Sequence, residues 1–412
     1  MRIDDEIADP HTNANMERYE EIFSKLRRET PVRWVEPAGY RPFWVISKYK
    51  DVKEIEMVPE IFSSTARTIL LTIEEEAAIV QYTGGRTKPL RFIVDMDGTD
   101  HRYHRGVAQA WFMPKALQAI RSRIDALAET FVARMEAGGG RCDFVKDIAS
   151  LYPLRVIMTL LGVPEEDEPL MLRYTREMLG SSDPDVQNGA TSGEKIMESV
   201  QGFITYFREF AEKRKNATDD NVASVLVNAG LGQLELDSYF IILATAGHDT
   251  TSGTISGGLL ELLRNPDQMQ LLRDQPDLID SAIDEMLRCV TPVKNFMRTA
   301  TRDYELRGQT IRAGEEVMLC YASANRDEEI FDQPNRFMIG RRPNPHLAFG
   351  FGPHVCLGNN LAKMEIRSLF KALLDRFDDI ALAGKPDWLI ASQVSCLTAL
   401  PVSYVSKVAQ TV

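Results

Sequence analysis

The pattern of apolar and polar positions is helical over most of the chain. From about residue 100 to about residue 263, apolar residues recur every three to four positions, with interruptions at EAGGGRCD, GVPEED, GSSDPD and NAGLGQ. The pattern returns in DLIDSAIDEMLRCV, where Asp277 and Asp280 suit the N-terminal end of a helix, and in GNNLAKMEIRSLFKALLDRF. These segments predict a mainly α-helical fold.

A smaller part of the chain has strand-like patterning. Residues 31–46 contain two short runs around a Pro-Ala-Gly turn, which predicts a hairpin, and residues 304–321 contain further short strands. Residues 63–92 show no clear period and include the loop TGGRTKP, and long loops inside compact enzymes are commonly lids or pocket walls. We find no repeat and no linker. The sequence predicts a single domain over residues 1–412, mainly α with a minor β portion.

Residues 236–264 are predicted to form one long helix with an unusual centre. The first half of this segment is apolar nearly all round, which indicates burial. The centre is rich in glycines and β-branched threonines, which disfavour a helix interior. These residues are Gly247, Thr250, Thr251, Gly253, Thr254, Gly257 and Gly258.

Two interpretations of this centre remain open. The glycines could simply admit neighbouring helices. Alternatively the centre is a site, in which Gly247 lets a ligand approach the backbone and a threonine hydroxyl bonds back to a carbonyl and opens the helix. Asp249 beside Thr250 would then place an acid next to an alcohol, as proton delivery to a bound molecule requires. His248 points elsewhere around the helix and is interpreted as structural.

Charge and composition narrow the classes of function. The 412-residue chain has a formal net charge of -12, which argues against nucleic acid as its main partner. The N-terminus is polar, and no window reaches the ~18 uncharged apolar residues of a membrane helix. We expect a cytoplasmic monomer with no membrane segment. The five cysteines are dispersed and form no CxxC pair, which indicates reduced thiols.

One cysteine, Cys356, lies in a glycine-rich loop at the start of a predicted helix. The segment FGFGPHVCLG fits the pattern F-x-x-G-x-x-x-C-x-G, from Phe349 to Gly358. Loop N–H groups and the positive end of the helix would favour a thiolate, which is a strong iron ligand. A zinc site with His354 and His346 is the alternative, but a structural zinc site needs four ligands and no fourth lies nearby.

Taken together, these motifs resemble those of the cytochrome P-450 monooxygenases over nearly the whole chain, and within them those of the soluble bacterial terpene hydroxylases of the α-terpineol monooxygenase family. AGHDTT resembles the oxygen-activating helix segment of that family, and EMLR supplies its E-x-x-R pair, Glu285 and Arg288, with Arg341 as the third member of a buried ion-pair network. The resemblance implies the P-450 fold, with haem between a long central helix and a cysteine-ligand loop.

The resemblance also implies the cofactor and its contacts. The cofactor is haem b (iron protoporphyrin IX), with Cys356 as the axial iron ligand and Asp249 and Thr250 as the catalytic pair. The two haem propionates need cationic or donor partners, and arginine is well suited to carboxylates. The implied cofactor-binding residues are His101, Arg105, Gly247, Arg298, Phe349, His354, Cys356 and Gly358.

The implied reaction inserts one atom of O₂ into a C–H bond and needs external electrons. The chain has no nucleotide fingerprint of its own, since Glu235 stands where the third glycine after Gly230 and Gly232 belongs. The resemblance implies an iron–sulfur ferredoxin with an NAD(P)H-dependent ferredoxin reductase as partners. Candidate docking residues are Arg102, Lys363 and Arg367.

The substrate is expected to be a small hydrophobic molecule, a monoterpenoid or an aromatic hydrocarbon. Expected pocket walls are residues 63–92, 176–185, 243–247, 293–297 and 395–397, which are mostly apolar. The alternatives are a larger apolar substrate such as a steroid or fatty acid, and a peroxide-using haem-thiolate enzyme. A non-catalytic haem sensor or carrier is a further alternative, although no output module is visible.

Overall fold

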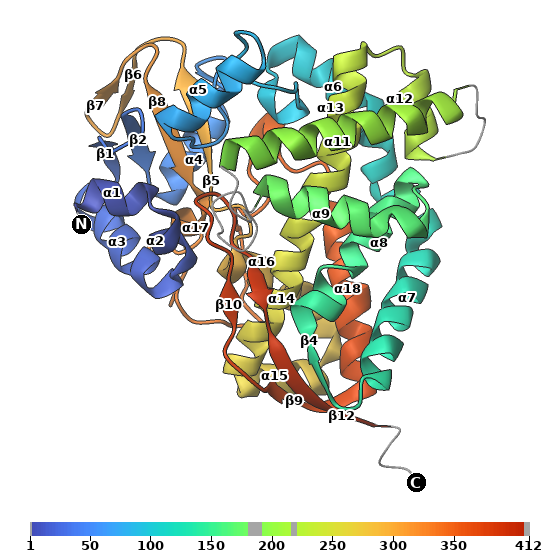
Figure 1. The fold of residues 1–412 in the computed structure, drawn as a ribbon. Coiled ribbons are helices and arrows are strands. Elements are labelled where there is room, and N and C mark those ends of the chain that lie inside the picture. Colours follow the sequence, from blue (N-terminus) through green and yellow to red (C-terminus); the bar gives the residue numbers. More distant parts are fainter. Residues whose placement is uncertain (1, 180–191, 216–220, 408–412) are drawn as a thin grey trace.

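Helices form most of the molecule, as Figure 1 shows for a computed structural model that describes residues 2–179, 192–215 and 221–407. The α-helices are α1 (Ile3–Ala8), α2 (Pro10–Ala14), α3 (Met16–Glu29), α4 (Tyr49–Glu56), α5 (Ile73–Tyr82), α6 (Gly98–Gln109), α7 (Pro114–Ala137), α8 (Tyr152–Leu161), α9 (Glu168–Leu179), α11 (Ser192–Lys213), α12 (Val222–Asn228), α13 (Gln233–Ala246), α14 (Asp249–Arg264), α15 (Pro266–Asp274), α16 (Ile279–Val290), α17 (Tyr321–Ala324) and α18 (Asn359–Arg376). Short 3₁₀ or π turns, η1 to η6, lie at Ile93–Asp95, Ala110–Phe112, Val145–Ala149, Glu165–Asp167, Pro276–Leu278 and Gly352–His354.

The strands are few and short. They are β1 (Val32–Val35), β2 (Phe43–Ile46), β3 (Phe62–Ser63), β4 (Arg141–Asp143), β5 (Asn295–Ala300), β6 (Tyr304–Leu306), β7 (Gln309–Ile311), β8 (Glu316–Cys320), β9 (Phe377–Leu382), β10 (Asp387–Trp388), β11 (Leu397–Ala399) and β12 (Pro401–Ser406). Five of them form the largest sheet, in the order β1-β2-β8-β5-β3, and the others form the small sheets β4-β12-β9, β10-β11 and β6-β7. The mainly α fold with a minor β portion is confirmed.

The five-stranded sheet contains the predicted hairpin. Strands β1 and β2 are antiparallel with Trp34 opposite Trp44, and β2 runs parallel to β8. All four residues of β2 are buried because both faces of the sheet are covered. Phe43 and Val45 face the core formed with α1 and α3, whereas Trp44 and Ile46 face the core formed with α4 and α17. This alternation follows from the two-residue period of a strand.

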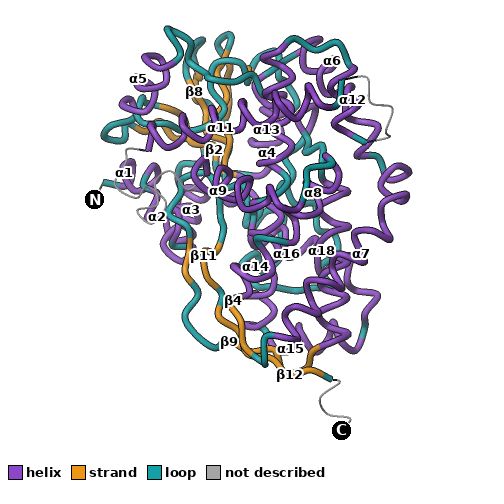
Figure 2. The backbone as a smooth tube through the Cα atoms, turned by 45° about the vertical axis from the view of Figure 1, so that its right-hand side comes forward, coloured by secondary structure: helices purple, strands orange, loops and turns teal. Residues whose placement is uncertain are grey.

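The largest core belongs to the helical body, in which α14 lies among α8, α16 and α18 (Figure 2). A Cβ added at Gly257 would lie 2.7 Å from Val290 of α16, and one at Gly258 would lie 2.8 Å from Met286. One at Gly253 would lie 2.9 Å from the sulfur of Cys396. The first interpretation of these glycines is therefore confirmed at three positions, since each one admits a neighbouring segment.

Residues 63–92 contain a helix, α5, that the hydrophobic pattern did not predict. None of its residues is buried, so it lacks the amphipathic period that marks a packed helix. Its start is set by a capping box, in which Thr72 accepts a hydrogen bond from the Glu75 backbone and the Glu75 carboxylate accepts one from Thr72. The segment TGGRTKP follows this helix as a loop, as predicted.

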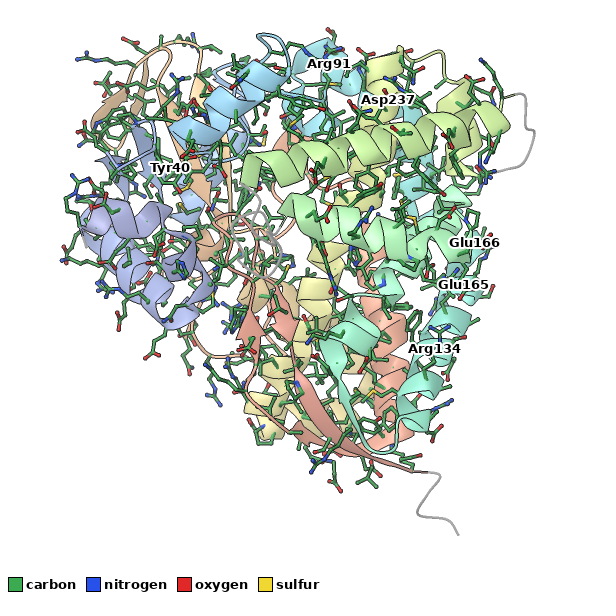
Figure 3. All side chains as sticks on the ribbon, viewed as in Figure 1. Tyr40, Arg91, Arg134, Glu165, Glu166 and Asp237 are labelled. Atoms are coloured by element: carbon green, nitrogen blue, oxygen red, sulfur yellow. The ribbon has the colours of Figure 1, made fainter. Side chains whose placement is uncertain are left out.

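Ion pairs between charged side chains connect elements near the surface of the molecule (Figure 3). Asp237 of α13 is 2% exposed and accepts a hydrogen bond of 2.7 Å from Arg208 of α11. Arg134 of α7 lies 3.9 Å from Glu165, and both are marked at the outer edge of the molecule. Among the described helices, none is both long and apolar enough to span a bilayer.

Candidate active site

A cavity of about 220 Å³ lies between the junction of α13 with α14 and the loop that precedes α18. Its walls are mainly apolar, and one end carries cationic side chains. The apolar lining includes Ile93, Phe112, Ile157, Leu243, Ala246, Val293 and Phe296. Of the ten residues singled out in the sequence, nine line this cavity, and they are His101, Arg105, Gly247, Thr250, Arg298, Phe349, His354, Cys356 and Gly358.

The expected pocket walls are met only in part. The segments 243–247 and 293–297 contribute lining residues, whereas 63–92 and 395–397 do not. Ser395 and Cys396 pack against Gly253, which places them behind α14 rather than beside the cavity. Residues 176–179 do not line the cavity, and residues 180–185 fall outside the described part of the chain.

The predicted long helix over residues 236–264 is interrupted at its centre. Helix α13 ends at Ala246 and α14 begins at Asp249, with Gly247 and His248 between them. The Thr250 hydroxyl donates a hydrogen bond of 2.8 Å to the carbonyl of Ala246. A hydroxyl that bonds back in this way disturbs the regular ladder, and glycine adds to the effect. The prediction of one continuous helix is therefore wrong, and the local opening is confirmed.

Asp249 is the one singled-out residue that does not line the cavity. Its side chain is 18% exposed, and its Oδ1 lies 3.2 Å from Nδ1 of His248, which is fully buried. Burial raises the pKa of the Asp249 carboxyl, while His248 and Arg176 act in the opposite direction. The carboxyl therefore retains a proton more readily than an exposed aspartic acid, a property that suits a proton donor.

The loop before α18 presents the Cys356 thiol to the cavity. Gly350 and Gly352 have φ values of +69° and +68°, a conformation that side-chain-bearing residues rarely adopt, and the Cys356 amide donates a hydrogen bond of 2.8 Å to the Phe349 carbonyl. Cys356 has accessible surface on the side of the cavity, although protein surrounds it otherwise, whereas the other four cysteines are buried or half-buried. The residues that form the loop thus turn one sulfur atom toward the cavity.

The electrostatics of this thiol differ in part from the expectation. Burial is the largest effect and raises the pKa of Cys356, while a hydrogen bond with the Gly358 backbone and the charge of Arg105 lower the pKa. The loop and the cation do favour a thiolate, but they do not outweigh burial. Burial also raises the pKa of Cys289, which does not line this cavity, to about 12.

The donor side chains of His101, Arg105, Arg298 and His354 all line the cavity, and the part of its wall that they form is called its charged end. The rings of His101 and His354 lie 4.3 Å apart, and His354 is 3.5 Å from Asp97. Burial, together with the nearby charges of His354 and Arg105, lowers the pKa of His101 to about 4. These positions fit a ligand with two carboxylates, because such a ligand would relieve the repulsion among the cationic groups.

The two arginines have donors available for such a ligand. Arg105 makes no hydrogen bond or ion pair with another described residue. Arg298 donates to the carbonyl of Met297 at 2.8 Å, and its other terminal nitrogen is 3.9 Å from Glu56. Burying a guanidinium such as that of Arg105 without a hydrogen-bond partner costs free energy. A bound carboxylate would accept hydrogen bonds from N–H groups that have no acceptor in the protein.

Glu56, at the end of α4, is a cavity residue that the sequence analysis missed. Its side chain is 2% exposed, and Tyr321 donates a hydrogen bond of 2.6 Å to it. The other carboxylate oxygen has no hydrogen-bond partner among the described residues. No local sequence signal marks Glu56, because its partners Arg298 and Tyr321 follow more than 200 residues later.

The expected ion-pair network is present and buried. Arg288 donates two hydrogen bonds of 2.8 Å to Glu285, and Arg341 donates to the same carboxylate at 3.1 Å. Arg288 also donates to the carbonyls of Asn325 and Pro334, so it connects segments far apart in the chain. This geometry supports a structural role, and breaking such a pair leaves an uncompensated buried charge.

The zinc alternative has no support in the described residues. They contain no group of three or more histidine, cysteine, aspartate or glutamate side chains placed to hold a metal ion. His346 lies 3.5 Å from Asp284, and His354 lies against Asp97 and His101.

Comparison with known proteins agrees with this geometry. The family model described as Cytochrome P450 matches residues 12–403. The chain belongs to the cytochrome P450 family. This P450 is 38% identical over 395 residues to Cytochrome P450-terp of a Pseudomonas species, covering 93% of this chain and 92% of that protein. It is 33% identical over 419 residues to the Steroid C26-monooxygenase of Rhodococcus jostii, covering 97% of this chain and 84% of that protein.

A solved structure is also similar over the full length. The crystal structure of CYP108D1 from Novosphingobium aromaticivorans has a TM-score of 0.92 and 35% sequence identity, and the match covers 98% of both chains. Membership of the family makes this chain a cytochrome P450 monooxygenase with a haem-thiolate cofactor. The open donors at the charged end and the thiol at the cavity wall fit that cofactor.

Proposed function

We propose that this P450 hydroxylates a small hydrophobic substrate, a monoterpenoid or an aromatic hydrocarbon. The reaction consumes O₂, two electrons and two protons, and yields the alcohol and water. The observation that carries the proposal is the apolar wall of Leu243, Ala246, Val293 and Phe296 in the cavity that Cys356 also lines. Burial of apolar substrate surface against this wall supplies affinity at roughly 25 cal/mol per Å² before ordering costs.

Within this proposal, the Cys356 thiolate would hold the haem iron. The haem, held by a thiolate, supplies the activation of O₂. Bound iron would also stabilise the thiolate that burial otherwise disfavours. His101, Arg105, Arg298 and His354 hold the two propionates.

Three further residues are proposed to contact the haem by their position. Phe349 and Gly358 flank the sulfur at the two ends of the loop, and a Cβ added at Gly358 would be 4.0 Å from it. Gly247 lines the cavity, and the nearest atoms to an added Cβ there would be in Ile157 and the Leu243 carbonyl, at the ordinary contact distance of 3.6 Å. Lack of a side chain at Gly247 would leave room for small molecules in the cavity beside a bound haem.

Asp249 and Thr250 are proposed to control protons. The Thr250 hydroxyl is tied to the Ala246 carbonyl at the helix interruption and faces the cavity, so it can hold a proton beside bound oxygen. Asp249 supplies protons to this position. Retention of the acid–alcohol pair favours use of O₂ over direct use of peroxide.

Electrons are proposed to come from an iron–sulfur ferredoxin and its NAD(P)H-dependent reductase. Lys363 is 2.6 Å from Asp284, and Arg367 donates to Asp280 at 2.6 Å, so acids partly neutralise both candidate docking cations. Arg102 is exposed and forms no hydrogen bond or ion pair with another described residue. Arg102 is therefore the strongest candidate for contact with an acidic partner.

Substrate class is tested by spin-state titration of the ferric holoprotein. We expect monoterpenes or small aromatic hydrocarbons to displace the iron-bound water and shift the haem toward high spin. The same panel should include steroids and fatty acids, because one relative is named a steroid monooxygenase. A shift caused only by steroids or fatty acids would favour the larger substrate, and a shift caused only by polar molecules would overturn the proposal.

The electron source is tested on the same preparation. Product should form with NADH, ferredoxin and its reductase in the presence of O₂. Turnover with hydrogen peroxide alone, equal to or above the ferredoxin-supported rate, would identify a peroxide-using enzyme instead.

A further inference from the structure

The buried imidazole of His248 has one nitrogen fixed as a proton donor. Its Nε2 lies 2.6 Å from the backbone carbonyl oxygen of Ser150. A carbonyl oxygen only accepts hydrogen bonds, so Nε2 must carry a proton. In neutral histidine the other nitrogen, Nδ1, is then a bare lone pair.

That bare nitrogen faces an acid. Nδ1 of His248 is 3.2 Å from Oδ1 of Asp249, and His248 is fully buried. Neither Nδ1 nor Oδ2 of Asp249 has a hydrogen-bond partner among the described residues. A lone pair beside an ionised carboxylate is repulsive in a buried place, whereas one proton on either group removes the repulsion.

We propose that His248 and Asp249 hold one proton in common, and that His248 is a positioning residue that keeps this proton available at the α13–α14 junction. The inference rests on the proposed role of Asp249 as proton supplier to Thr250. It assigns a task to a histidine that the sequence analysis treated as structural. The proton occupies either the imidazole or the carboxyl, and the pair as a whole titrates in one coupled step.

The neighbouring elements present few competing groups. On α9, Arg176 donates to the Ser150 hydroxyl at 3.4 Å and favours the ionised carboxylate. Cys396 donates to the Asp249 carbonyl at 3.4 Å, and burial raises the pKa of that thiol, so it is neutral. Lys294 lies near Cys396, and burial lowers the pKa of its ammonium to about 7.

The carboxyl of Glu365 on α18, which packs against α14, is a further buried titratable group, and on α16 the charges of Glu285 and Arg288 pair with each other. Burial raises the pKa of Glu365 well above the usual value, which keeps it protonated and uncharged. Among these groups, Arg176 is the one whose charge acts on the Asp249 carboxyl, and it favours the ionised form.

The first experiment observes the proton directly, without turnover. The holoprotein, labelled with ¹⁵N-histidine and held in the diamagnetic ferrous carbon monoxide form, is titrated by NMR. The chain has six histidines, and His248→Gln assigns the signals of this one. We expect Nε2 to remain protonated at every pH and Nδ1 to titrate. Asp249→Asn should lower the pH of that step by about one unit or more, because the partner carboxylate is gone.

The second experiment separates proton holding from structural support. Gln at position 248 can still donate to the Ser150 carbonyl but has no titratable group. Coupling is measured as product formed per NADH, and it is expected to fall as the pH rises and the shared proton is lost. If the pair holds the proton, His248→Gln should shift this fall to a pH lower by about one unit. If His248 is only structural, His248→Gln should match the wild type, while His248→Phe should lose holoprotein.

The chain offers a matched control pair. His104 is also buried, and its Nδ1 lies 3.1 Å from Oδ1 of Asp100, but neither residue lines the cavity. His104→Gln and Asp100→Asn should leave the pH profile of coupling in place. A shift in these controls equal to that of His248→Gln would overturn the assignment.

Failure of this inference and failure of the proposed function give different results. If the NMR titration shows that Nδ1 never takes up a proton while Asp249 is ionised, the shared proton is refuted. The proposed catalytic role of Asp249 is not affected by that result. Full coupling at the wild-type rate in Asp249→Asn removes that catalytic role, even if the NMR titration shows the shared proton.

Discussion

Tyr321 donates a hydrogen bond of 2.6 Å to Glu56 at the charged end of the cavity. Arg298 approaches the same carboxylate at 3.9 Å, and the other oxygen of Glu56 has no partner among the described residues. Burial raises the pKa of Glu56 to about 7, although Tyr321 and Arg298 both oppose the shift. A carboxyl that changes charge near neutral pH therefore lies beside the proposed propionate partners.

The stability of the holoprotein should depend on pH through Glu56. The folded state binds the Glu56 proton more tightly than the unfolded chain, whose glutamate has a pKa of 4.5. Glu56 therefore contributes its full share to the free energy of unfolding below about pH 4.5. This contribution, roughly 3 kcal/mol in total, is lost as the pH rises toward about 7. Glu56→Gln should flatten this part of the profile, because the amide still accepts from Tyr321 but does not ionise. Unfolding followed from about pH 5 to about pH 8 measures the difference, and parallel profiles would contradict it.

Cys356→Ser should abolish the strongly red-shifted Soret band of the reduced, carbon monoxide-bound protein. A serine hydroxyl does not provide the thiolate on which that band depends. Cys142→Ser is the control, because Cys142 lies outside the cavity, and its spectrum should match the wild type. Retention of the band in Cys356→Ser would assign the ligand to another residue.

Thr250→Ala should leave haem content and substrate affinity nearly unchanged but should uncouple the reaction. The variant lacks the hydroxyl that donates a hydrogen bond to the Ala246 carbonyl in the wild type. It should still consume reductant, but more of the oxygen should leave as peroxide. Asp249→Asn should instead slow NADH consumption, since proton supply becomes limiting, and general acid roles are typically worth about 10²- to 10⁴-fold. Product and peroxide per NADH distinguish the two variants. A fully coupled Thr250→Ala enzyme would exclude the proposed role of Thr250.

Gly257→Ala should destabilise the fold although alanine is the better helix former. The new methyl would lie 2.7 Å from the branched side chain of Val290, and overpacking of this kind costs about 1–3 kcal/mol. Gly106 in α6 is the matched control, because no atom lies within 4 Å of its added Cβ. Gly106→Ala should stabilise by about 1 kcal/mol through helix propensity alone. Unfolding midpoints in urea should therefore move in opposite directions, and a shared direction would refute the packing argument.

Arg102→Glu should weaken ferredoxin binding without changing substrate affinity. Exposed charges act within a screening length of about 8 Å at 0.15 M salt, so the loss should shrink as ionic strength rises. Lys385→Glu makes the same charge change beyond the far end of α18 and should have little effect. Titration of both variants with ferredoxin tests this, and equal loss in the two would indicate a response to total charge only.

The sequence predicted the parts of the fold that local patterns determine. The hairpin of β1 and β2, the helices α16 and α18 and the cysteine loop all carry periodicity or a motif within a few residues. The helix interruption followed from Gly247 and Thr250, although its extent did not. Helix α5 was missed because it buries nothing, yet its Thr72–Glu75 capping box was a readable signal.

Long-range contacts account for what the sequence left out. Glu56 meets Tyr321 across 265 positions, and the His248 ring reaches the Ser150 carbonyl across 98. No spacing pattern in the sequence indicates either of these two contacts, because both depend on how the helices pack in three dimensions. For the same reason, Ser395 and Cys396, which were expected in a pocket wall, lie behind α14 instead.

The glycine contacts along α14 also limit how the enzyme can be redesigned. Gly253, Gly257 and Gly258 lie so close to two segments, α16 and residues 395–396, that an added Cβ would come within 3.0 Å of them, so this side of the helix offers little freedom for protein engineering. Variation in substrate scope must come from the opposite side. Libraries that change Leu243, Val293 and Phe296 should retain folded variants, because their side chains border open space rather than a neighbouring backbone.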